Sequence, residues 1–120
     1  MRFVTLLVIL LICCEAKYVP ADGIYALTEE MPQYQEGQEA FDDYVKQAAA
    51  QSENQGAGQV FVSFIVSTDG SLKEAKAVNP RSDQVGEDAV KIITGAPGSW
   101  LPGIEEGQPV DVKLVYPVRF

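Results

Sequence analysis

The spacing of apolar residues after position 38 predicts two helices. Residues 39–50 carry an apolar stripe with the spacing of one helix face, made of Phe41, Tyr44, Val45 and Ala48. A second helix is predicted over 82–94, with Ser82 or Asp83 as its cap and Gly95 as its stop. Its apolar stripe is Val85, Ala89, Ile92 and Ile93.

Three other segments have the residue types or the two-residue period of strands. Residues 60–66 are rich in Val, Phe and Ile, and Asp69-Gly70 predicts a tight turn into a more polar strand at 72–78. Residues 110–120 alternate to the end of the chain, and Pro117 indicates a strand at a sheet edge because it has no N–H. The segment between the second helix and the last strand, 95–107, is expected to be a loop whose Trp100 covers the core.

The order of these elements predicts an α+β fold. We expect a small three-stranded antiparallel sheet with two helices on one face, in which the last strand pairs beside the first. The last and second strands would then form its two edges.

The first 14 residues follow a different pattern. Arg2 is their only charge, and the apolar run from Phe3 to Ile12 is broken only by Thr5. A basic start and roughly 7–15 apolar residues are typical of a secretory signal, whereas a membrane-spanning helix needs about 20. We therefore expect export, and three parts: a signal peptide or lipoprotein signal at 1–16, an acidic tether with little regular structure at 17–38, and one domain at 39–120.

Three processing routes stay open for this signal. Cys14 resembles the lipidated cysteine of a bacterial lipoprotein, which would give the chain a lipid anchor. Alternatively, Cys14-Glu15-Ala16 is a small-x-small site with cleavage before Lys17. The third route is an uncleaved interfacial anchor. In the first two routes the mature domain has no disulfide, so its core alone must stabilise it.

Charge and composition exclude several classes of function. The chain has 17 acidic and 9 basic residues and no histidine. A net charge of −8 argues against sequence-independent nucleic-acid binding, which needs a basic patch. Without histidine there is no His-based zinc site and no Ser-His or Cys-His pair, and adjacent carboxylates in the sequence point apart. We therefore expect neither an enzyme nor a bound metal or cofactor.

An ordered set of short motifs resembles a known family. The motifs are Glu29-Glu30-Met31-Pro32, Gly37-Gln38-Glu39-Ala40, Gly58 to Val66 with Asp69-Gly70-Ser71, Asp88-Ala89, Trp100-Leu101-Pro102-Gly103, Gly107-Gln108-Pro109-Val110 and Pro117-Val118-Arg119-Phe120. In order and approximate spacing they resemble the TonB carboxy-terminal domain, in the version common in Bacteroidetes-type TonB family proteins. The resemblance covers residues 29–120.

The resemblance implies a periplasmic domain that grips a short extended segment, the TonB box, of an outer-membrane transporter. Family members lend an edge of the last strand to that segment, and an exposed edge can accept an added strand. Carried over to this chain, the peptide-binding residues are Val110, Asp111, Val112, Lys113, Leu114, Val115, Tyr116 and Val118.

A complete TonB protein also has a spanning helix with a functional histidine and a long Pro-rich linker. This sequence has no histidine, and its apolar run and tether are too short for such a helix and linker. We therefore expect a stand-alone receiving domain. The alternative function is a structural or assembly module. In that case the last strand would pair with a second copy, as a homodimer, or with another envelope protein.

Overall fold

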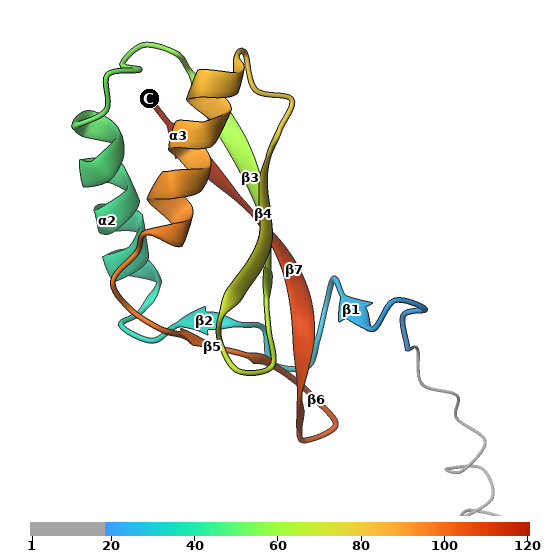
Figure 1. Ribbon diagram of the computed structural model, residues 1–120. Coiled ribbons are helices and arrows are strands. Elements are labelled where there is room, and N and C mark those ends of the chain that lie inside the picture. Colours follow the sequence, from blue (N-terminus) through green and yellow to red (C-terminus); the bar gives the residue numbers. More distant parts are fainter. Residues whose placement is uncertain (1–18) are drawn as a thin grey trace, which may run out of the picture.

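The computed structural model describes residues 19–120, so the predicted signal at 1–16 and Cys14 lie outside the described residues. Figure 1 shows the two helices together on one side of a long twisted sheet. In chain order the elements are β1 (Ile24–Tyr25), β2 (Gln33–Tyr34), α2 (Gln38–Ala50), β3 (Gln59–Val66), β4 (Leu72–Val78), α3 (Asp83–Thr94), β5 (Trp100–Leu101), β6 (Gly103–Glu105) and β7 (Gln108–Arg119).

Both predicted helices are confirmed, to within a residue at each end. Ser82 caps α3, because its Oγ accepts a hydrogen bond of 3.2 Å from the Val85 N–H. The apolar stripes of α2 and α3 pack with one face of β3 in a single core, whose fully buried members include Phe41, Val62, Phe64 and Ile93. Over residues 19–120, neither helix has the length and apolar character needed to cross a membrane.

The sheet is larger than predicted. The predicted antiparallel pairing is confirmed at its centre, where β3 lies between β4 and β7. However, β1 adds to β7 in parallel and β6 adds antiparallel, so the sheet is five-stranded and mixed. The prediction of three antiparallel strands is therefore incomplete, because strands of two or three residues are too short to show a period in the sequence.

The segment expected to be a tether also differs from the prediction. β2 pairs with β5, and Glu30 and Ile104 exchange backbone hydrogen bonds of 3.1 and 2.8 Å. Residues 24–34 thus lie along 100–112 and do not extend as a tether. The segment 95–107, which was expected to be a loop, contains the short strands β5 and β6.

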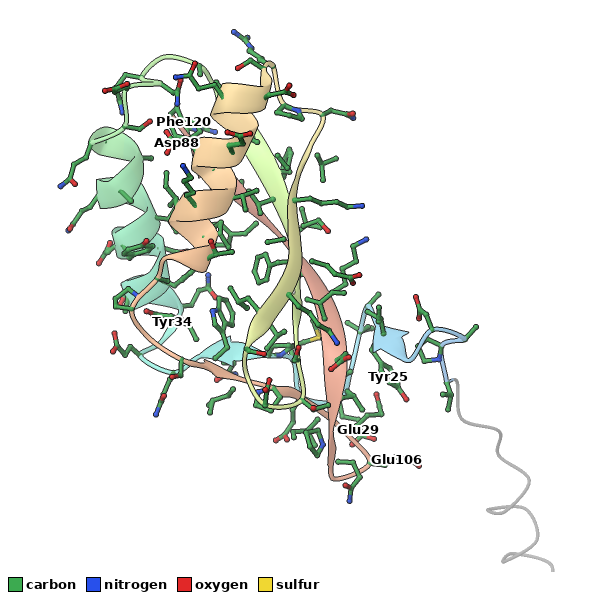
Figure 2. The ribbon with its side chains drawn as sticks, viewed as in Figure 1. Tyr25, Glu29, Tyr34, Asp88, Glu106 and Phe120 are labelled. Atoms are coloured by element: carbon green, nitrogen blue, oxygen red, sulfur yellow. The ribbon has the colours of Figure 1, made fainter. Side chains whose placement is uncertain are left out.

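An aromatic cluster explains this docking. The Trp100 ring lies 5.0 Å from that of Phe41, 5.5 Å from that of Tyr34 and 5.6 Å from that of Phe64, between centroids. The Tyr34 hydroxyl accepts a hydrogen bond of 2.6 Å from the Gly98 N–H. In Figure 2, Tyr34 lies close to the helices, whereas Tyr25 lies on the other side of β7. The predicted role of Trp100 as a cover for the core is confirmed by its burial.

The turn between β3 and β4 is the predicted Asp-Gly turn. Asp69 accepts hydrogen bonds from the Ser71 N–H at 3.0 Å and from its hydroxyl at 2.7 Å, which lower the pKa of the Asp69 carboxyl. Gly70 has a φ of +83°, and a Cβ there would lie 2.2 Å from the Trp100 carbonyl oxygen. Only glycine therefore fits this position.

Candidate functional site

The second half of β7 is an open strand edge. β3 pairs with β7 from Val112 to Arg119. β1 pairs with it only at Asp111 and Val112, and β6 only at 108–110. Among the described residues, β3 is therefore the only strand beside 114–119. We call this stretch of β7 the open edge; it agrees with the edge position predicted from Pro117.

The pairing register determines which backbone groups face the open edge. The Phe120 N–H donates to the Gly58 carbonyl at 2.9 Å, so position 120 belongs to a hydrogen-bonded pair of the ladder. Hydrogen-bonded and non-bonded positions alternate in an antiparallel ladder. The backbone groups of Val115, Pro117 and Arg119 therefore point away from β3. This places the N–H groups of Val115 and Arg119 on the open edge and gives Pro117 a position where its missing N–H removes no bond to β3.

The chain itself occupies the start of the same edge. Ile24 and Tyr25 lie opposite Asp111 and Val112 in parallel register. The Ile24 N–H donates to the Asp22 carboxylate at 3.0 Å, so it is turned away from β7. Two of the residues predicted to contact a peptide are thus already paired within the chain.

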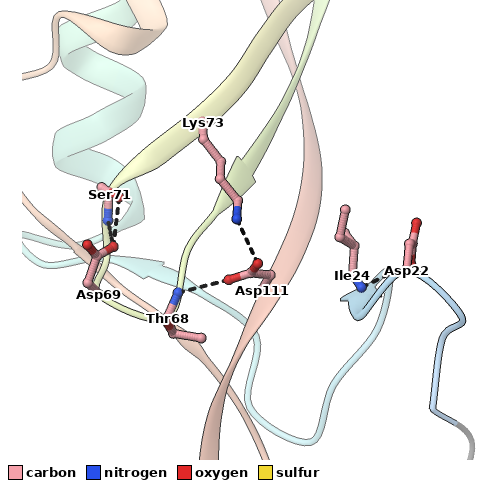
Figure 3. A network of polar contacts seen from close by, with 7 residues as sticks. All are labelled: Asp22, Ile24, Thr68, Asp69, Ser71, Lys73 and Asp111. Atoms are coloured by element: carbon pink, nitrogen blue, oxygen red, sulfur yellow. Dashed lines mark hydrogen bonds and ion pairs between the residues drawn. The ribbon is translucent and has the colours of Figure 1, made fainter.

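Asp111 has a further structural role. Its carboxylate accepts a hydrogen bond of 3.0 Å from the Thr68 N–H and one of 2.8 Å from the Lys73 ammonium, as Figure 3 shows. The hydrogen bond to Asp111 raises the pKa of Lys73. Asp111 therefore ties the β3–β4 turn to β7, and the structure does not leave its side chain free for a peptide.

The remaining predicted residues divide between the two faces of β7. Val112, Leu114, Tyr116 and Val118 share the face that is turned to the helices. The Tyr116 hydroxyl donates a hydrogen bond to the Asp42 carboxylate on α2. Burial, as the larger cause, and this hydrogen bond raise the pKa of Tyr116. Lys113 and Val115 are exposed on the opposite face, and Val110 pairs with Gly103 in β6.

Sequence reasoning missed three contributors to this edge. Arg119 and the Pro117 carbonyl belong to it because positions 117 and 119 follow Val115 at intervals of two residues and so face the same way. The two-residue period of this strand is visible in the sequence. β1 was also missed, and no sequence signal indicates it, because a two-residue strand has no period.

The family comparison agrees with this geometry. Residues 40–120 match the family described as Gram-negative bacterial TonB protein C-terminal, and no curated protein and no solved structure matches the chain. The match covers two thirds of the sequence, including α3, all but the first two residues of α2 and every strand from β3 onward. The family consists of non-catalytic interaction modules of the cell envelope. The chain belongs to the TonB C-terminal domain family.

Proposed function

We propose that the chain is a cell-envelope binding module that pairs through the open edge of β7 with the TonB box of an outer-membrane transporter, and so supports TonB-dependent transport. The observation that supports this proposal is the row of backbone groups at Val115, Pro117 and Arg119 that points away from β3. An incoming extended peptide can hydrogen-bond to such groups and add a strand to the sheet.

The number of backbone groups on the open edge that can hydrogen-bond to a peptide sets the strength of binding. Two N–H groups, of Val115 and Arg119, and three carbonyls, of Val115, Pro117 and Arg119, face the open edge. Each hydrogen bond nets about 0.5–1.5 kcal/mol, so five give roughly 2.5–7.5 kcal/mol before the ordering of the peptide is subtracted. This corresponds to weak, rapidly reversible binding, which suits a module that must release its partner.

Export and anchoring are part of the proposal. The apolar run at 3–12 supports export to the periplasm, with Cys14 carrying a lipid anchor or being removed with the signal. The intact mass of the mature protein distinguishes these routes. A mass that corresponds to a chain beginning at an acylated Cys14 supports the anchor. A mass that corresponds to a chain beginning at Lys17 supports simple cleavage.

A peptide titration tests the proposed pairing. Amino-terminal transporter peptides that contain a TonB box are added to the labelled domain, and backbone amide signals are followed. We expect the signals of 113–119 to move at millimolar peptide. If they do not move, the proposal fails.

A variant pair localises the effect to the backbone. Val115→Pro removes an N–H from the open edge without removing a ladder bond to β3, so binding should weaken while the fold is retained. Val115→Thr keeps both the N–H and the branched shape and is the matched control. Equal binding by the two variants would exclude strand addition at this position.

The same edge supports a second candidate function, a structural or assembly module. The Val115 side chain is apolar and 57% exposed, and two copies can pair their open edges about a two-fold axis. This alternative predicts dimers that form with increasing concentration in light scattering and are weakened by Val115→Lys. A strict monomer at high concentration contradicts it.

A further inference from the structure

The face of the sheet turned away from the helices concentrates positive charge in an acidic protein. This outer face consists of alternate residues of β3, β4 and β7, opposite to those that enter the core. Four of the seven basic residues within 19–120 lie on it, and the other three are Lys46, Arg81 and Lys91. The four are Lys73, Lys76, Lys113 and Arg119.

A hollow of about 280 Å³ opens on this face. It lies where β4 bulges, since the β3–β4 register shifts between Ser63 and Ile65 and Glu74 adopts a φ of 52°. Its lining consists of Ser63, Ile65, Glu74, Ala75, Lys76 and Lys113.

The floor of the hollow contains a polar group with no partner. Ser63 is only 3% exposed, and its Oγ makes no hydrogen bond within the described residues. A buried hydroxyl without a partner is destabilising, so its presence calls for an explanation. Lys76 lies directly opposite Ser63 in the ladder, and Lys113 lies opposite Ile65, the next residue of β3 on this face.

The two lysines are available for a ligand. Lys73 is held by Asp111 at 2.8 Å, whereas neither Lys76 nor Lys113 forms an ion pair or side-chain hydrogen bond within residues 19–120. Glu74 is the one acidic residue in the lining, so the hollow carries a small excess of positive charge. The lining thus has a formal net charge of +1, which a single carboxylate balances.

We propose that this hollow binds a carboxylate side chain of an acidic segment of a partner protein. The Ser63 hydroxyl donates a hydrogen bond to the carboxylate, and the ammonium groups of Lys76 and Lys113 neutralise it. Apolar side chains on the same face then contact apolar neighbours of the acid in the partner, because Phe61, Val78 and Val115 are 47%, 42% and 57% exposed.

The site is separate from strand addition. The hollow opens on the outer face between β4 and β7, whereas the proposed TonB-box pairing uses in-plane backbone groups of 114–119. Either site can therefore be tested and can fail without the other.

A pair of short peptides tests the proposal. Ac-Val-Glu-Val-NH2 and its neutral match Ac-Val-Gln-Val-NH2 are titrated into the labelled domain at low salt. We expect the amide signals of Ser63, Lys76 and Lys113 to move with the Glu peptide, and added salt to weaken this binding. Equal shifts with the Gln peptide, or no shift of these signals, would overturn the proposal.

Single variants then assign the contacts. Ser63→Ala and Lys76→Gln should each weaken the Glu peptide roughly three- to tenfold, as expected for the loss of one hydrogen bond or one partly exposed charge. Lys91→Gln, on α3 and outside the lining, is the matched charge control and should bind as the wild type does. If Ser63→Ala binds the Glu peptide unchanged, the hydroxyl is not a ligand and the assignment is wrong.

Discussion

Ile24 lies opposite Asp111 in a parallel pair, so the chain places a strand of its own on the edge of β7. The pairing ends at Val112, and the open edge begins two residues later. An incoming segment that extends past the open edge toward Asp111 must therefore displace β1. We therefore predict that β1 and a long peptide compete for this part of β7.

Releasing β1 should strengthen the binding of such a peptide. The Ile24 N–H is already bonded to Asp22, which leaves the Tyr25 N–H as the donor of β1 that can reach β7. Tyr25→Pro removes this donor, and we expect a peptide long enough to cover 111–119 to bind roughly tenfold tighter by calorimetry, equivalent to about 1.4 kcal/mol.

The control for this prediction is Tyr25→Ala, which keeps the N–H and removes only the side chain. A peptide that covers 114–119 alone should not distinguish Tyr25→Pro from wild type. Unchanged affinity of the long peptide for Tyr25→Pro would mean that partners do not use 111–112.

Two serine variants should differ in their effect on stability. Ser63→Ala removes a buried hydroxyl without a partner, so the free energy of unfolding should stay the same or rise by up to about 1 kcal/mol. Ser82→Ala removes the cap of α3 and should lower it by about 1 kcal/mol. Urea unfolding measures both, and a clear loss for Ser63→Ala would show that its hydroxyl has a partner in solution.

Tyr116 should make the domain sensitive to high pH. Burial and the hydrogen bond to Asp42 raise its pKa in the folded state, so its contribution to stability is fully present below the unfolded value of about 10. As pH rises above that value, the unfolded state ionises first and stability falls. Ultraviolet titration of phenolate should show one late-ionising tyrosine fewer in Tyr116→Phe than in the wild type; Tyr44, whose pKa burial also raises, remains in both. Ionisation of Tyr116 near pH 10 in the folded domain contradicts this.

The sequence predicts long elements well and short ones poorly. The stripe ending at Ile93, the alternation of β7 and the turn at Asp69-Gly70 each extend over enough residues to have a period or a specific turn chemistry. By contrast, the contact of Tyr34 with Trp100 joins residues far apart in the chain, and it docks a segment whose composition resembles a linker.

The candidate sites show the same limit. Pro117 indicated the edge because its missing N–H is a covalent property of the residue. The hollow at Ser63 was not predictable, since it depends on a bulge in β4 and on the absence of a partner for one hydroxyl. Both are properties of the assembled sheet.

Amide hydrogen exchange along β7 is the sharpest test of strand addition at the open edge. In the free domain we predict slow exchange at Leu114, Tyr116 and Val118, which face β3, and fast exchange at Val115 and Arg119. A saturating TonB-box peptide should then slow Val115 and Arg119 and leave the even positions nearly unchanged. Continued fast exchange at Val115 and Arg119 in the saturated complex would contradict strand addition at the open edge.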